Sequence, residues 1–137
     1  EHELLGAALR CGNGATGMVD NICSGGGAVL IDDKGYLRKY AREFNFSKTT
    51  TTCHPDSGFV FENQQVPYYK EAIALCCRAH RFFYGLESVG WDVAITENGP
   101  TILEANGLWG AALMQDKYGG LKKRWAAHCA TYGIKYE

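Results

Sequence analysis

Two short β-like segments, residues 91–96 and 101–105, flank the turn sequence Glu97-Asn98-Gly99-Pro100. Adjacent asparagine and glycine between two runs of β-forming residues are a strong sign of a β hairpin. A hairpin makes its two strands antiparallel neighbours, so it fixes the topology of this part of the chain. It also decides which polar side chains face one another across the ladder.

Three oxygen-bearing side chains lie on this hairpin. Glu104 and Asn106 are two residues apart, so both project from the same face of a strand. The place of Asp92 depends on the turn. A two-residue turn at Asn98-Gly99 would turn Asp92 away from Glu104. A three-residue turn that begins one residue earlier, with Gly99 as a bulge, would place Asp92 directly opposite Glu104.

If these groups converge, their chemistry indicates a hard divalent cation. Two facing carboxylates repel each other unless a positive charge lies between them. Magnesium prefers oxygen ligands, takes a few from the protein, and completes its shell with water and phosphate oxygens. The alternative interpretation is that Asp92 and Glu104 are ordinary solvent-facing residues on an exposed sheet.

The N-terminal half of the chain predicts strands. We expect a short strand at residues 5–11 and a β hairpin formed by residues 28–31 and 36–44 around a turn rich in Asp and Gly. Residues 45–66 show no periodicity and contain four consecutive threonines. They are expected to form a long surface loop.

The C-terminal half predicts helices on either side of the second hairpin. Apolar residues at helical spacing predict an amphipathic helix over 67–83, with Gly85 as its stop, and a last helix over 120–131, ended by Gly133. The whole chain, residues 1–137, is therefore expected to be one α+β domain. It would have an antiparallel sheet with helices packed on one face.

Composition excludes several classes of protein. The 137 residues carry 14 Lys and Arg against 15 Asp and Glu, so the net charge is −1 and a nucleic-acid partner is not expected. No apolar run approaches the ~20 residues that span a bilayer, so no membrane contact is expected. The six cysteines include no C-x-x-C pair, which argues against structural zinc. We expect reduced thiols in a cytoplasmic protein.

Several short motifs follow one another in order over about residues 8–121: Leu9-Arg10, Val19-Asp20-Asn21, Gly25-Gly26-Gly27, His54-Pro55, Ser57-Gly58, residues 90–96, residues 99–106, Gln115 and Gly119-Gly120. This order resembles the sugar-transfer-associated branch of the ATP-grasp superfamily, in which an aspartate strand precedes a Glu-x-Asn strand. The resemblance implies that the chain is the C-terminal lobe, or subdomain, of an ATP-grasp fold.

The resemblance also implies an activity. ATP would phosphorylate a small carboxylate or a sugar-linked substrate, and an amine or similar nucleophile would then displace the phosphate. Such a ligase would serve polysaccharide or sugar-conjugate biosynthesis. Two magnesium ions are implied: Asp92 would hold one, Glu104 would bridge both, and Asn106 would hold the second.

Three further residues take roles by the same resemblance. Arg10 would be catalytic, because a guanidinium fork matches the oxygens of the transferring phosphate or the acyl-phosphate. Leu103 would touch the adenine of ATP. Asn21 and the glycine triplet after it would meet the phosphate or the acceptor substrate. The plainer alternatives are a surface arginine, a sheet-packing leucine and an ordinary glycine turn.

The other lobe of an ATP-grasp fold supplies a lysine and a flexible glycine-rich loop over the phosphates. We expect that lobe to be absent from this chain. ATP would therefore bind weakly, and the chain alone would not catalyse the ligation. A homodimer through the surface left by that lobe is expected. The alternatives are a non-catalytic binding module that keeps the ATP-grasp scaffold, or an unrelated α+β domain with Asp92 and Glu104 on opposite faces.

Overall fold

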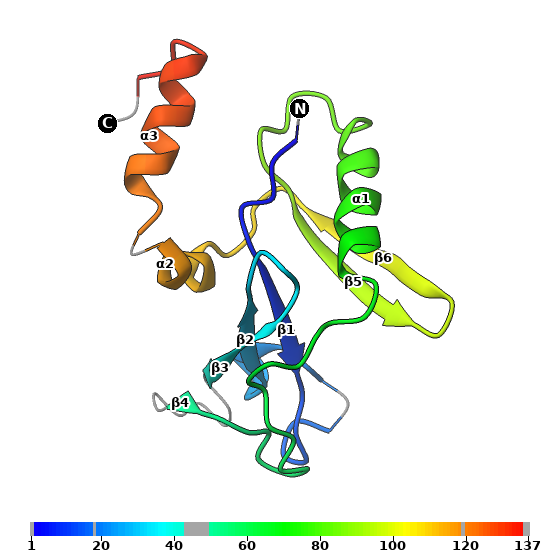
Figure 1. The fold of residues 1–137 in the computed structure, drawn as a ribbon. Helices are drawn as coiled ribbons and strands as arrows, with labels where there is room; N and C mark the ends of the chain where they lie inside the picture. Colours follow the sequence, from blue (N-terminus) through cyan, green and yellow to red (C-terminus); the bar gives the residue numbers. More distant parts are fainter. Residues whose placement is uncertain (1, 18, 43–49, 119, 136–137) are drawn as a thin grey trace.

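The computed structural model describes residues 2–17, 19–42, 50–118 and 120–135 and shows two antiparallel sheets with three helices (Figure 1). The larger sheet has the strand order β1 (Ala7–Cys11), β2 (Gly27–Ile31), β3 (Leu37–Arg42) and β4 (Thr50–Thr51). The smaller sheet is the hairpin of β5 (Gly90–Thr96) and β6 (Gly99–Asn106). The helices are α1 (Tyr69–His80), α2 (Ala112–Tyr118) and α3 (Lys122–Thr131), with a short 3-10 helix, η1 (Ile22–Ser24).

The α+β class with antiparallel pairing is confirmed, but the strands divide between two sheets where one was expected. Both predicted hairpins and both predicted helices occur. Helix α2 was not predicted, because seven residues give too few turns for a helical period to show. The last residues of the predicted strand 36–44 and the first of the predicted loop lie outside the described residues.

The hydrophobic core lies on one face of the larger sheet. Its members come from β2, β3, α1 and the segment before α1: Val29, Ile31, Leu37, Ala41, Phe61 and Tyr69. Val29 and Ala41 face each other in the ladder and are completely buried. Phe61 is one of the largest fully buried side chains, so the described part of the predicted surface loop contributes to the core.

Helix α1 is shorter than predicted. It begins at Tyr69, after Tyr68 adopts a left-handed conformation, and it ends at His80, five residues before the predicted stop at Gly85. Helix α3 ends at Thr131, and Gly133 follows as the predicted stop, where the N–H groups of Gly133 and Ile134 donate to the carbonyls of Ala130 and Cys129. With a positive φ at Gly133, these bonds form a Schellman motif.

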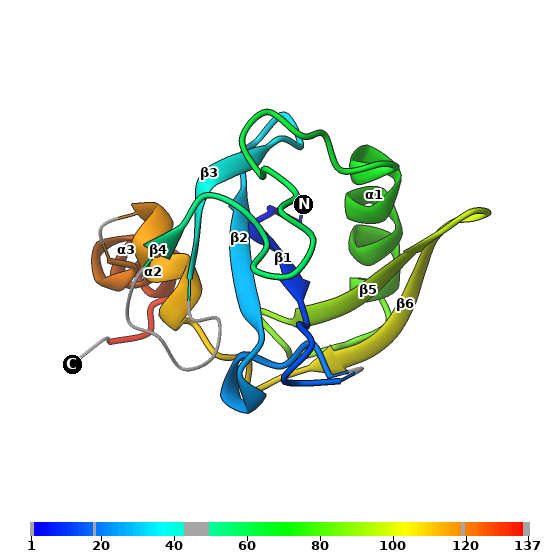
Figure 2. The ribbon, with the colours of Figure 1, turned by 90° about the horizontal axis from the view of Figure 1, so that it is seen from below.

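The elements form three groups in space. Figure 2 shows α1 and the β5–β6 hairpin on one side of the larger sheet and α2 and α3 on the other. Trp91 of β5 packs edge-on against Phe83, with ring centroids 5.4 Å apart. An ion pair of Arg124 with Glu3 and a hydrogen bond between His128 and Glu87 connect α3 to the rest of the chain.

Two expectations from composition can be compared with the structure. Within the described part of the chain, no helix has the length and apolar character to cross a bilayer. All six cysteines are free thiols, as predicted. Cys76 and Cys77 lie half-buried on α1, where burial raises the pKa of the Cys76 thiol.

Candidate functional site

The β5–β6 hairpin brings the predicted ligands together. Asp92 lies directly opposite Glu104, and Asn106 lies opposite Gly90 at the next position of the same face. Of the two arrangements that the sequence left open, the structure thus has the one with Asp92 opposite Glu104, and the alternative of an unrelated domain with these two residues on opposite faces is excluded. Neither predicted turn occurs, because Thr96 pairs with Gly99 around a two-residue turn at Glu97 and Asn98.

A bulge in β6 produces the pairing. Val93 pairs with Ile102 and Asp92 with Glu104, so Leu103 is an extra residue in β6. Without this bulge the ladder would pair Asp92 with Leu103 and would turn Glu104 to the other face. Leu103 is 70% exposed, so its side chain offers apolar surface beside Glu104.

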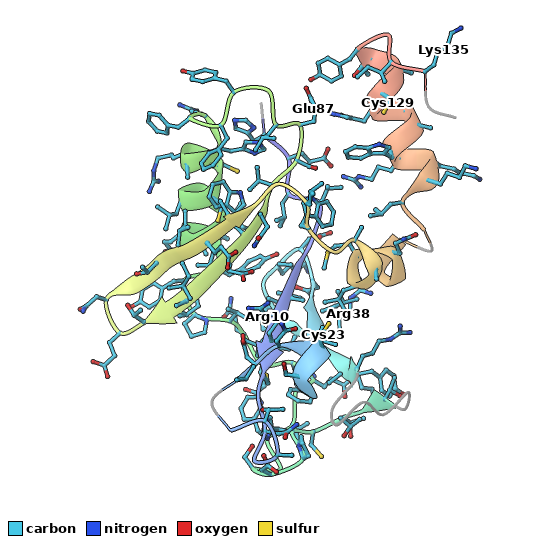
Figure 3. All side chains as sticks on the ribbon, turned by 180° about the vertical axis from the view of Figure 1, so that it is seen from behind. Arg10, Cys23, Arg38, Glu87, Cys129 and Lys135 are labelled. Atoms are coloured by element: carbon cyan, nitrogen blue, oxygen red, sulfur yellow. The ribbon has the colours of Figure 1, made fainter. Side chains whose placement is uncertain are left out.

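Arg10 joins this site from the larger sheet. Its Nη2 lies 3.2 Å from Oδ2 of Asp92, and its Nε lies 3.3 Å from Oδ2 of Asp20. The pairing of Leu9 with the buried Val29 explains this direction, because alternate residues of β1 face opposite sides and Arg10 points away from the core. Figure 3 shows Arg10 on β1.

Asp20 was not singled out by the sequence reasoning, although it stands in the quoted motif Val19-Asp20-Asn21. Its contact with Arg10 spans a loop, so no local pattern reveals it. Asp20 also adds to the effect of burial in raising the pKa of the Cys11 thiol. Cys11 therefore stays protonated near neutral pH and offers no thiolate beside the site.

Asn21 uses its side chain to shape the backbone. Its Oδ1 accepts a hydrogen bond from the N–H of Cys23, 3.0 Å away, and its carbonyl accepts from the N–H of Gly26. A Cβ atom on Gly26 would lie 2.5 Å from the carbonyl oxygen of Asp20, so only glycine fits there. The glycine triplet, residues 25–27, is buried and leads into β2, which supports its interpretation as a tight turn. The ligand role of Asn21 stays a prediction.

His54 connects the loop after β1 with the loop that contains Asp56 and Ser57. Its Nε2 lies 2.7 Å from the carbonyl oxygen of Gly12, and its Nδ1 accepts from the N–H groups of Asp56 and Ser57. A carbonyl can only accept, so Nε2 carries the proton and Nδ1 does not. Asp56 also accepts from the N–H of Gly14 at 2.6 Å. His54 is thus half-buried, and its contacts hold these two loops together.

The donor set of the hairpin fits a hard cation. It consists of two carboxylates and one amide, which are oxygen ligands of the kind magnesium takes together with water and phosphate oxygens. Across the described residues, no group of three or more His, Cys, Asp or Glu side chains is placed to hold a metal. Arg10 supplies positive charge at Asp92, as a bound cation would.

The fold and this hairpin define an α+β chain in which a strand with Asp92 is followed by a strand with Glu104 and Asn106. A family model described as sugar-transfer associated ATP-grasp matches residues 1–129. The match covers most of the 137 residues, so the chain belongs to the sugar-transfer associated ATP-grasp family, and the resemblance seen in the sequence is confirmed. No curated protein and no solved structure matches the chain.

Proposed function

We propose that this chain is the metal- and nucleotide-binding, C-terminal lobe of an ATP-dependent ligase. The enzyme would join a carboxylate to an amine or similar nucleophile through an acyl-phosphate. The observation that carries the proposal is the pairing of Asp92 with Glu104, with Asn106 on the same face and Arg10 in contact. Membership of the ATP-grasp family supports the use of ATP.

Each predicted ligand has a distinct place in this proposal. Asp92 would hold one magnesium ion, Glu104 would bridge two, and Asn106 would hold the second. Bound magnesium would supply positive charge that neutralises the triphosphate and aligns its terminal phosphoryl group. Asp92 is partly exposed and Glu104 is exposed, so both carboxylates can take ligands without opening the core.

Arg10 would be the catalytic cation. Its contact with Asp92 is partly solvent-exposed, and such pairs are worth only about 0–1 kcal/mol. Arg10 would therefore release Asp92 at little cost when that carboxylate coordinates an ion. Its guanidinium group, still held by Asp20, would then donate to the transferring phosphate.

The nucleotide base and the substrate would lie on either side of these groups. Leu103 is exposed next to Glu104 and would contact the adenine. Asn21 would meet the phosphate or the acceptor through its side-chain amide, since its Oδ1 is used by Cys23. The family description and the free cysteines support a sugar-linked substrate and a reducing, cytoplasmic setting.

A calorimetric titration of magnesium-ATP tests the proposal. Glu104→Gln removes one ligand charge with little change in shape and should weaken magnesium-dependent binding about tenfold or more. Glu97→Gln is the matched control, because it makes the same change at an exposed position in the turn of the same hairpin. Equal affinity of the wild-type protein and Glu104→Gln would overturn the metal site.

A non-catalytic module that keeps the ATP-grasp scaffold is the second candidate. The observation that favours it is the contact of Arg10 with both Asp20 and Asp92, which places a positive charge beside these carboxylates without an ion. This candidate predicts nucleotide binding that does not depend on magnesium, or no binding at all. The titration above therefore separates the two.

We also propose that the chain alone self-associates and does not turn over. Several large apolar side chains are exposed on the turn after α1 and after β6: Phe82, Tyr84 and Leu108. Exposed apolar surface of this kind promotes association. Sedimentation velocity over a range of concentrations should show a dimer, and a monomer at the highest concentration would contradict it. Robust ATP-dependent ligation by the purified chain would contradict the predicted inactivity.

A further inference from the structure

Gly90, the first residue of β5, lies on the same face of the hairpin as the predicted metal ligands. It pairs with Asn106, and Asp92 pairs with Glu104, with no register shift between these two pairs. Residues two apart on a strand project from the same face. A side chain at residue 90 would therefore stand opposite Asn106, on the face that carries Asp92 and Glu104.

Trp109 occupies the space that this side chain would fill. A Cβ atom added to Gly90 would lie 2.5 Å from Cβ of Trp109 and 3.0 Å from its Cγ, closer than two non-bonded carbon atoms can approach. Trp109 follows Asn106 by three residues, so the chain turns back over the start of β5 as soon as β6 ends. Trp109 thus faces Asn106 across the ladder, beside the carboxylates.

A hydrogen bond fixes the indole ring in this place. Nε1 of Trp109 donates to Oγ of Ser88 over 3.1 Å. Ser88 precedes Gly90 by two residues, so both contacts of Trp109 join the segment after β6 to the start of β5. Trp109 is half-buried, whereas its neighbour Leu108 is fully exposed. Trp109 is therefore the residue that anchors this segment to the hairpin.

We propose that Trp109 is a positioning residue, which holds the end of β6 so that Asn106 is placed to bind a metal ion. This role rests on the proposed function, in which Asn106 holds the second magnesium ion. Asn106 is the last residue of β6, and the ends of elements open most easily. Residues that orient a metal ligand typically contribute about 10- to 100-fold to metal affinity.

A calorimetric titration of magnesium-ATP with single and double variants tests this role. Trp109→Ala and Asn106→Ala should each weaken magnesium-dependent binding about tenfold or more. Because Trp109 acts through Asn106, Trp109→Ala should cause no further loss once residue 106 is alanine. A general loss of structure would instead weaken binding in both backgrounds.

Two further variants make the result specific. Trp109→Phe keeps an aromatic ring over Gly90 and should retain most of the affinity. Trp125→Ala is the matched control, because Trp125 is a half-buried tryptophan of α3, on the other side of the larger sheet from the hairpin (Figure 2). It should leave the affinity unchanged. Thermal unfolding of each variant checks that it is folded.

An NMR spectrum of the ¹⁵N-labelled chain tests the contact without metal or nucleotide. The ring current of an indole acts over a short range, so it affects the side-chain amide signals of Asn106. These signals should move in Trp109→Ala and stay in place in Trp125→Ala. Gly90→Ala, which forces the ring out of its place, should move the same signals.

The inference is overturned if the Asn106 signals do not move in Trp109→Ala, if Trp109→Ala binds magnesium-ATP like the wild-type protein, or if it causes the same loss in the Asn106→Ala background. Its failure differs from that of the proposed function. Weaker binding in Glu104→Gln with unchanged binding in Trp109→Ala overturns only the positioning role. Unchanged binding in both Glu104→Gln and Asn106→Ala overturns the metal site and this role together, and a shift of the Asn106 signals would then show a packing contact alone.

Discussion

The guanidinium group of Arg10 links the two sheets of this chain. Arg10 extends from β1 and contacts Asp92 of β5 and Asp20 of the loop between β1 and η1. The exposed fractions of these side chains lie between 31% and 50%, so the contacts add little to stability. These contacts matter because they hold the positively charged guanidinium group of Arg10 beside the facing carboxylates of the hairpin.

Asp32 gives a pH-dependent test at the residue scale. Its Oδ1 accepts hydrogen bonds from the N–H groups of Tyr36 and Lys34, each at 2.9 Å. The bond from Tyr36 above all, with that from Lys34, holds the pKa of this carboxyl below its ordinary value. The ionised form is therefore favoured in the folded state. Its contribution to stability is present above the ordinary pKa and is lost as the pH falls through the lower native pKa.

We expect Asp32→Ala to lower the free energy of unfolding near neutral pH and to have less effect at an acidic pH that protonates this carboxyl in the folded state. Urea unfolding at the two pH values measures this difference. Asp32→Asn keeps an acceptor oxygen without the charge and should remove the pH dependence. The same loss in Asp32→Ala at both pH values would contradict the role of the charge.

At the scale of elements, tight backbone contacts shape the loop that carries Asp20. The turn from η1 into β2 brings Gly26 against the carbonyl oxygens of Asp20 and Cys11. A methyl group at Gly26 would approach these oxygens to 2.5 and 2.9 Å, so the backbone would have to move. The position of Asp20 beside Arg10 therefore depends on a glycine here.

Gly26→Ala should lower the free energy of unfolding by about 1–3 kcal/mol, the usual cost of overpacking. Gly110→Ala is the control, because a Cβ atom there meets nothing within 4 Å. It should change stability by less than about 0.5 kcal/mol. Chemical denaturation of both variants measures the difference, and equal effects would show that the close contact is unimportant.

Local signals explain which elements could be predicted. The turn at Asp32 and the Asn98-Gly99 pair mark their hairpins, and helical spacing marks α1 and α3. The bulge at Leu103 has no such marker, so the pairing of Asp92 with Glu104 was predicted only as one of two alternatives. The buried place of Phe61 and the contact between Arg10 and Asp92 depend on the tertiary fold, and residues far apart in sequence create them.

At the scale of the whole molecule, the hydrophobic core and Arg10 lie on opposite faces of the larger sheet. The core covers one face, where β2, β3 and Phe61 are buried. The other face carries Arg10, which connects it to the β5–β6 hairpin (Figure 3). Substitutions on this second face should therefore change binding with little effect on folding.

The most direct measurement replaces magnesium with manganese and records the NMR spectrum of the ¹⁵N-labelled chain with ATP. Manganese is paramagnetic and also prefers oxygen ligands, so it broadens the signals of residues close to its site. We predict selective broadening of Asp92, Glu104 and Asn106 in the wild-type protein and its loss in Glu104→Gln. Uniform or absent broadening around this hairpin, or the same broadening in Glu104→Gln, would contradict a metal site formed by these three side chains.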